Sequence, residues 1–254
     1  MTLIIGANLN NYVLVAADTR TSWNHPIFGE SFKDHDHKII NCKTGLVTGS
    51  GYTEALDSVK EELLRREINH TGEIEEIVNE KAIPKIRLLN KNNPEVKNKT
   101  TFLVSYFTKT VDKQNILRLA FLHPDWNYKI SIVKETIIIM PSDSQKEEVD
   151  EYSNKLSKGI ARSTPIYSPE NILNESVIAN ITKNLFFIAD CFNEISKKSK
   201  YVSKDFDYAV LFANEIIIYC YVTSSGLKNI NLKLSVFHRN NHSYVLSPKI
   251  FTEK

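Results

Sequence analysis

The order of segments along the chain predicts a mixed domain, α+β or α/β, in which helices cover sheets. Short apolar runs come first, amphipathic stretches follow, and strand-like and helix-like segments then alternate in blocks. The chain has 254 residues and a hydrophobic content of 42%, which is enough to bury a sizeable core. Because no repeat, low-complexity tract or linker interrupts it, we expect residues 1–254 to form a single domain.

The first elements are expected to be strands. Leu3–Leu9 is a short apolar run that ends at an amide-rich turn. Tyr12–Ala17 is apolar at every position, as is typical of a strand in a sheet covered on both faces, and Asp18 follows it directly. The polar stretch Ser22–His37 predicts a loop or a long hairpin.

Helices are expected where apolar residues recur at helical spacing. Tyr52–Asn69 has this spacing, with Thr53 suited to the N-cap. Glu73–Leu89 predicts a second helix, which Pro84 kinks or divides. The other expected strands are Lys38–Ile40, Leu46–Thr48, Thr100–Thr108, Ile116–His123, Lys129–Ile132, Thr136–Met140, Tyr208–Phe212, Ile216–Val222 and Leu232–Phe237, and the other expected helices are Ser144–Gly159 and Asn174–Ser196.

The bulk composition argues against several kinds of partner and compartment. Lysine and arginine total 32 against 30 acidic residues, and the formal charge of +2 favours neither a nucleic acid nor a membrane surface. Three scattered cysteines make neither a disulfide framework nor a zinc site. No apolar stretch approaches the ~20 residues of a transmembrane helix, and no signal peptide opens the chain. We therefore expect a soluble, cytoplasmic protein.

Thr2 is the first residue with a possible chemical role. A hydroxyl is a weak nucleophile unless a base is held against it. Removal of Met1 would give Thr2 a free α-amine, a base within the same residue whose unperturbed pKa of ~7.7–8.0 suits catalysis near neutral pH. A threonine after the initiator methionine is common, so the hypothesis that Thr2 is catalytic depends on the other motifs in the sequence.

Asp18 and Lys38 form the second signal. A carboxylate at the end of a buried strand is costly unless it is paired. It would be satisfied either by a structural ion pair with Arg20 or by a lysine that it positions. Lys38 opens a strand after the polar stretch, and an ammonium group beside the Thr2 oxygen would stabilise developing negative charge.

The turn Thr48–Gly51 reads Thr-Gly-Ser-Gly and joins a strand to a helix. Backbone N–H groups at such a turn are free to form an oxyanion hole, although the same residues also suit an ordinary turn. The turn lacks the spacing and the lysine of a phosphate-binding Walker A loop.

Taken in order, these motifs resemble the first quarter of a proteasome β-type subunit, a family of N-terminal-nucleophile (Ntn) hydrolases. An N-terminal Thr-Leu-Ile-Ile-Gly precedes a strand that closes on Ala-Asp-Thr-Arg, then a Lys-Ile strand start, then the Thr-Gly-Ser-Gly turn before a helix. Thr2 and Asp18 have the separation that the family uses. The resemblance is specific over about Thr2–Ala55 and general beyond it. It implies an α+β fold, a four-layer α-β-β-α sandwich.

The resemblance gives each of these residues a role. Thr2 would be the nucleophile, Asp18 the partner of the lysine, Lys38 the lysine that tunes the threonine, and the Gly49 N–H the oxyanion donor. Lys33 is nearer in raw count to the family's lysine, but the apolar strand that follows Lys38 favours Lys38.

The later part of the family pattern is less complete. Ser142 takes the place of the family's serine after a central strand, without the two glycines that usually flank it. Ser203 and Asp205 are candidates for a further serine and aspartate that the family places before a later strand, again without the glycines.

The implied activity is that of a threonine-type endopeptidase, most similar to a bacterial proteasome-type protease. It would act on peptides or unfolded proteins, need no cofactor or metal, and assemble as a homo-oligomeric ring or spiral. Two alternatives stay open: an Ntn amidase or acylase acting on a small-molecule amide, and a catalytically inactive structural subunit. The missing glycines around Ser142 favour inactivity, whereas Thr2, Asp18 and Lys38 oppose it.

Two further groups of residues are expected to be structural. His35 and His37 alternate as metal ligands on a strand would, but no third ligand is evident, so we expect exposed loop residues. Trp23 and Trp126 are expected to be packing residues.

Overall fold

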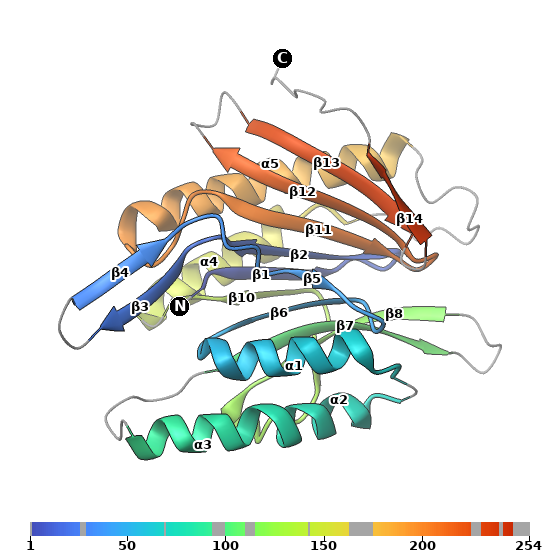
Figure 1. Cartoon of the computed structure of the whole chain (residues 1–254). Helices are drawn as coiled ribbons and strands as arrows, with labels where there is room; N and C mark the ends of the chain where they lie inside the picture. The colour runs from blue at the N-terminus through green and yellow to red at the C-terminus, as the bar shows by residue number, and fades with distance from the viewer. Residues whose placement is uncertain are drawn as a thin grey trace.

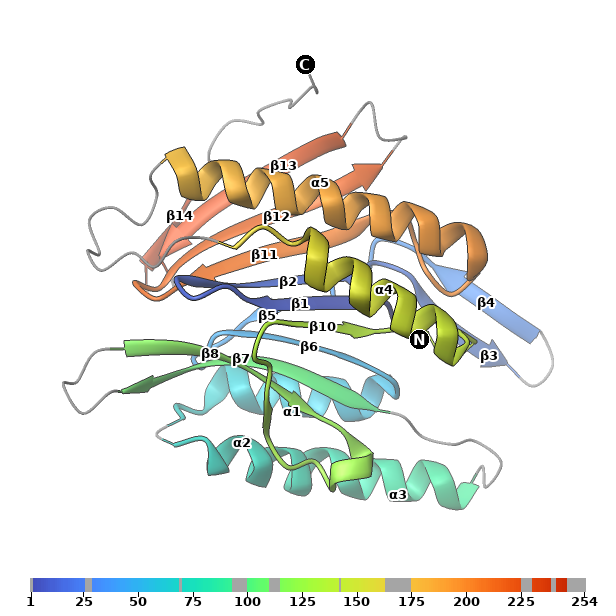
Figure 2. The same cartoon turned by 180° about the vertical axis from the view of Figure 1, so that it is seen from behind.

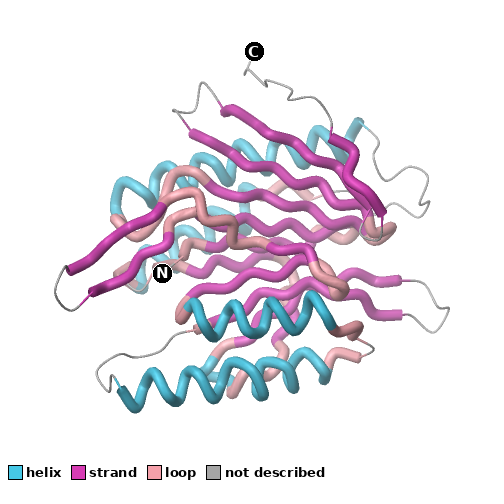
Figure 3. Tube along the Cα trace, in the orientation of Figure 1, coloured by secondary structure: helices cyan, strands magenta, loops and turns pink. Residues whose placement is uncertain are grey.

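The computed structural model describes residues 2–25, 29–68, 70–92, 100–109, 115–141, 143–162, 175–224, 230–238 and 241–245. Two antiparallel sheets face one another, and a separate hairpin of β3 (Thr21–His25) and β4 (Gly29–Lys33) extends from one end (Figures 1 and 3). Apart from Thr21, the two strands of the hairpin fall within the stretch Ser22–His37 that was predicted as a loop or long hairpin.

The first sheet has the strand order β10-β1-β2-β11-β12-β13-β14, and the second has the order β5-β6-β7-β8-β9. The strands of the first sheet are β1 (Ile4–Asn8), β2 (Tyr12–Asp18), β10 (Thr136–Ile139), β11 (Phe206–Phe212), β12 (Ile216–Ser224), β13 (Ile230–His238) and β14 (Asn241–Val245). Those of the second are β5 (Ile40–Asn41), β6 (Leu46–Ser50), β7 (Thr101–Lys109), β8 (Asn115–Leu122) and β9 (Ser131–Ile132).

Helices cover the outer face of each sheet. Figure 1 shows α1 (Thr53–Arg65), α2 (Gly72–Ile77) and α3 (Ile83–Asn92) against the second sheet. Figure 2 shows α4 (Lys146–Gly159) and α5 (Glu175–Lys198) across the first. The predicted α+β fold, a four-layer α-β-β-α sandwich, is therefore confirmed.

Three clusters of buried apolar side chains fill the spaces between the four layers. Successive residues of a strand point to opposite faces of its sheet, so one strand contributes to two clusters. In β1, Ile5 and Ala7 face α4 and α5, whereas Ile4 faces the second sheet. In β2, Leu14 belongs to the helix-facing cluster and Val15 to the cluster between the sheets. All seven residues of β2 are buried, as its continuous apolar run predicted.

Two predictions about the helices can be compared with the structure. The stretch predicted to kink or divide at Pro84 is divided by a π-helical turn, η1 (Val78–Ala82), between α2 and α3. The backbone stays helical through this turn, and Pro84 is the second residue of α3. The prediction of Thr53 as an N-cap is wrong. Tyr52 occupies that position, fixed by a 3.0 Å hydrogen bond from its N–H to Thr100 Oγ1.

Other differences are found in the strands and aromatic residues. β5 begins at Ile40, so Lys38 precedes the strand that it was predicted to open. β14 was not predicted. The expectation that Trp23 is a packing residue is wrong, because 47% of its surface is exposed. Trp126 packs against Phe121, but half of its surface stays exposed. Within the described part of the chain, no helix is both long and apolar enough to cross a membrane.

Candidate active site

Thr2 and Asp18 meet at one end of the first sheet because β1 and β2 are antiparallel neighbours. Ile4 pairs with Ala17, so the residue before β1 and the last residue of β2 lie side by side. The Asp18 carboxylate accepts a 2.6 Å hydrogen bond from the Leu3 N–H. The Asp18 side chain is fully buried, and Thr2 is only 6% exposed.

Lys38 joins the two residues. Its ammonium group donates to Thr2 Oγ1 at 2.9 Å, to Asp18 Oδ1 at 2.8 Å, and to the carbonyl of Arg20. With three acceptors, the ammonium has a partner for each of its hydrogens. Lys38 is 8% exposed, whereas the alternative Lys33 is exposed and pairs with Asp36. The structure therefore brings Lys38, and not Lys33, to Thr2.

Burial and hydrogen bonding act in opposite directions on Asp18. Burial raises the pKa of its carboxyl, and the Lys38 ammonium with the N–H groups of Leu3 and Arg20 lowers it. The structural ion pair between Arg20 and Asp18 does not form. The Arg20 guanidinium instead forms a bidentate ion pair with the Asp34 carboxylate, with hydrogen bonds of 2.7 and 2.8 Å. Lys38 is thus the cation that faces the buried carboxylate.

Gly49 directs its N–H toward the open edge of the second sheet. Cys42 and Gly45 exchange both backbone hydrogen bonds, at 2.8 and 3.0 Å, so alternate residues of β6 face β5. Val47 lies opposite Ile40, the first residue of β5. Gly49 lies two residues after Val47, so its N–H points in the same direction as that of Val47. At this position β5 has not yet begun, and no β5 residue lies opposite Gly49. Its N–H therefore points toward the segment that carries Lys38.

Only glycine fits at position 49. A Cβ there would lie 2.5 Å from Leu56 Cδ2 and 2.5 Å from the Thr101 carbonyl oxygen. We expect Gly49→Ala to lower the free energy of unfolding by about 1–3 kcal/mol, because the backbone carbonyl cannot move without shifting β7. Urea denaturation measures this change.

Gly72→Ala is the matched control, because its nearest obstacle is the ring of exposed His70 at 3.2 Å. We expect this change to stay within about 0.5 kcal/mol of the parent protein. Equal losses in the two variants would contradict the crowding inferred around Gly49.

Two residues that the sequence analysis did not select complete the site. Ser50 Oγ accepts a 3.1 Å hydrogen bond from the Thr2 backbone nitrogen. Asp207, fully buried in β11, accepts from the Lys38 N–H at 3.0 Å and lies 2.8 Å from His37 Nδ1. A single carboxylate in the apolar strand Phe206–Phe212 was the signal that could have identified Asp207.

Of the remaining predicted residues, Ser203 and Asp205 lie in the turn before β11, where the Asp205 carbonyl oxygen accepts a 3.2 Å hydrogen bond from the Thr19 N–H, next to Asp18. Ser142 lies outside the described residues. Ser203 accepts a 3.0 Å hydrogen bond from the Asp205 N–H, so its hydroxyl closes a local turn before β11. His35 and His37 are exposed, as predicted, and the described residues contain no cluster of three or more side chains suited to a metal ion.

A cavity of about 260 Å³ opens beside Thr2. Lys60 of α1 lines it, and burial lowers the pKa of this ammonium against the opposite effect of Asp57. The cavity is lined by Thr2, Arg20, Thr21, Ser22, Asp36, His37, Lys38, Gly49, Gly51, Thr53, Leu56, Asp57 and Lys60.

The fold is that of the proteasome-like Ntn hydrolases, as the N-terminal motifs predicted. Anbu (ancestral beta-subunit) from Yersinia bercovieri matches with a TM-score of 0.55 and 11% identity, over 83% of this chain and 81% of that one. Anbu from Hyphomicrobium sp. strain MC1 matches with a TM-score of 0.52 and 13% identity, over 83% and 82%. No protein-family model and no curated protein match the sequence.

Proposed function

We propose that this protein is a threonine-type peptidase that hydrolyses peptide bonds with Thr2 as the nucleophile after removal of Met1. One observation carries the proposal: the Lys38 ammonium lies 2.9 Å from Thr2 Oγ1 and 2.8 Å from the buried Asp18 carboxylate. A buried lysine that bridges a carboxylate and a threonine hydroxyl places positive charge beside the atom that would attack.

The backbone nitrogen of Thr2 stands in for the free α-amine of the processed chain. In that form it is the general base, with an unperturbed pKa of ~7.7–8.0. Ser50 Oγ, 3.1 Å away, would orient the amine toward the hydroxyl of the same residue. The activity should therefore rise with pH as the amine loses its proton.

Hydrolysis would proceed in two stages. The Thr2 Oγ attacks the carbonyl carbon, its proton passes to the α-amine, and the Gly49 N–H donates to the oxyanion. The amine then gives the proton to the leaving nitrogen, which departs as a free amine and leaves an ester on Thr2. Water activated by the same α-amine attacks the ester, so that the acid product leaves and Thr2 is restored.

Asp18 and Asp207 would position Lys38 rather than touch the substrate. Asp18 binds the ammonium, and Asp207 holds the main chain of Lys38. Positioning of this kind lowers the entropy cost of bringing the cation to the reacting oxygen.

We further propose that the protein assembles as a homo-oligomer, because the matched Anbu structure from Yersinia bercovieri is described as an ancestral β-subunit. Sedimentation velocity on the purified protein tests this point. A monomer at all concentrations would contradict the assembly and leave the proposed chemistry unaffected.

Intact mass and covalent labelling test the activity. We expect the purified protein to lack one methionine residue, and a peptide electrophile to modify Thr2, as located by peptide mapping. Retention of Met1 would remove the base and overturn the proposal. Modification at another residue would point to a different nucleophile.

A further inference from the structure

We propose that a second cavity, on the opposite side of Thr2, is the subsite for an aliphatic or aromatic side chain of the residue immediately after the scissile bond. This inference rests on the proposed peptidase activity and extends it to one side of the substrate.

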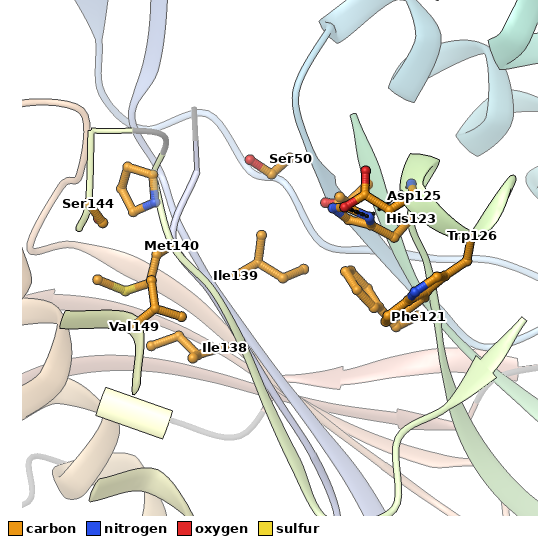
Figure 4. A pocket seen from close by; sticks show the side chains of 12 residues that line it. Ser50, Phe121, His123, Asp125, Trp126, Ile138, Ile139, Met140, Ser144 and Val149 are labelled. Atoms are coloured by element: carbon orange, nitrogen blue, oxygen red, sulfur yellow. Dashed lines mark hydrogen bonds and ion pairs between the residues drawn. The ribbon is translucent and has the colours of Figure 1, made fainter. Parts of the chain in front are cut away.

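The cavity has a volume of about 310 Å³, and its walls include residues of β8 in the second sheet, of β10 at the edge of the first sheet, and of α4 (Figure 4). In Figure 4, Phe121, His123 and Trp126 lie on one side, Met140, Val149 and Ile138 on the other, and Ile139 between them, with Ser50 at the upper rim. The lining residues are Ser50, Thr101, Phe121, His123, Asp125, Trp126, Ile138, Ile139, Met140, Pro141, Ser144 and Val149.

The strand order places Thr2 between the two cavities. In the first sheet β10 and β2 flank β1, and the cavity beside Lys38 lies on the β2 side. The second cavity lies on the β10 side. Ile139 pairs with Ile4, so Pro141 at the cavity wall comes level with Thr2.

The chemistry of the leaving group assigns the β10 side to the residue after the scissile bond. The α-amine of Thr2 must come within hydrogen-bond reach of the leaving nitrogen to protonate it. The Thr2 nitrogen donates a hydrogen bond to Ser50 Oγ, and Ser50 also lines the second cavity. The Gly49 N–H, which would bind the carbonyl oxygen, faces the other way, toward Lys38.

The lining favours an apolar side chain. Phe121 and Trp126 meet edge to face, with ring centroids 5.7 Å apart and an interplanar angle of 86°. Trp126 is 50% exposed, which leaves aromatic surface for a ligand to cover. The Asp125 side chain, 81% exposed at the rim, would repel an acidic residue.

A set of fluorescence-quenched peptides tests the proposal. The peptides share one acyl-side sequence and differ only in the residue after the scissile bond, which is Phe, Leu, Ala or Asp. We expect kcat/KM to be at least about tenfold higher for Phe and Leu than for Ala, and lowest for Asp. Product masses verify the cleaved bond.

Two variants change the cavity in opposite ways. Trp126→Ala removes exposed aromatic surface, and we expect the ratio of Phe to Ala peptides to fall toward one. Val149→Phe fills the cavity from α4, and we expect it to slow the Phe peptide more than the Ala peptide, so that the ratio falls. Leu88→Ala, on α3 with 60% exposure, is the control and should keep the parent ratios.

An electrophile that carries only acyl-side residues separates the two proposals. Thr2 should be labelled at the same rate in the parent protein and in Trp126→Ala. If Thr2 is labelled but cleavage does not depend on the residue after the scissile bond, the subsite is overturned and the proposed function stands. The same conclusion follows if the preference for Phe is unchanged in both variants. Absence of both labelling and cleavage would overturn the proposed function and the subsite with it.

Discussion

Thr2→Ala is expected to reduce peptide hydrolysis to background and to abolish labelling by the electrophile. Removing the nucleophile of a hydrolase whose residues act as a unit lowers kcat by about 10⁶-fold. Among the described residues the Lys38 ammonium donates to Thr2 Oγ1, Asp18 and the Arg20 carbonyl, so Thr2 supplies the hydroxyl that this cation contacts. Burst and steady-state hydrolysis of one peptide measure the loss.

Thr2→Ser is the matched variant, since it keeps both the hydroxyl and the α-amine after Met1 is removed. We expect it to retain measurable activity and labelling. Full activity in Thr2→Ala would show that another residue is the nucleophile. Loss in both variants, with Met1 still attached in the serine variant, would show that processing had failed rather than the chemistry.

Lys38→Met is expected to reduce both activity and stability. Loss of the ammonium beside Thr2 Oγ1 should lower kcat on the order of 10³-fold. It also leaves the fully buried Asp18 without its cation, and breaking a buried pair costs about 3–5 kcal/mol. Peptide hydrolysis and urea denaturation measure the two effects.

The stability loss in Lys38→Met should depend on pH. Burial already raises the pKa of Asp18, and loss of Lys38 removes an opposing influence. The folded variant then holds the Asp18 proton more tightly than the unfolded chain, whose carboxyl has a pKa of ~3.9. The penalty is therefore smallest below about pH 4 and grows as the pH rises toward neutrality.

Two further variants identify the source of these effects. Lys33→Met removes an exposed lysine from the same region, and exposed ion pairs contribute only about 0–1 kcal/mol, so activity and stability should be nearly unchanged. Adding Asp18→Asn to Lys38→Met should recover part of the lost stability and none of the activity. A Lys33→Met variant as impaired as Lys38→Met would contradict the assignment of the cation.

Much of the fold was predictable because its signals are local. The unbroken apolar run of β2 indicated a sheet covered on both faces, and Pro84 indicated where a helix divides. The start of α1 was misplaced because a contact with Thr100 across the fold, rather than a local cap, fixes Tyr52. The exposure of Trp23 and Trp126 depends on what the rest of the chain leaves uncovered, and local sequence does not contain that information.

The candidate site likewise contains residues that local motifs identify and residues that only contacts across the fold bring together. The order of the N-terminal motifs identified Thr2, Asp18 and Lys38, and the Lys38 ammonium contacts both of the other two side chains. Ser50 was not identified because its contact with the Thr2 nitrogen joins residues 48 positions apart, and the Gly-Ser-Gly sequence also suits an ordinary turn. Asp207 acts across strands, and only the pairing of β11 with β2 brings it to the Lys38 main chain.

The hydrogen bond from the Lys38 N–H to the Asp207 carboxylate joins residues 169 positions apart. Contacts so distant in sequence carry a larger loop-closure entropy than local contacts do. A partly synthesised chain could lose its methionine and expose a threonine, yet it would lack the strand that fixes the lysine segment. The Lys38 segment would therefore gain its Asp207 contact only after β11 has been synthesised.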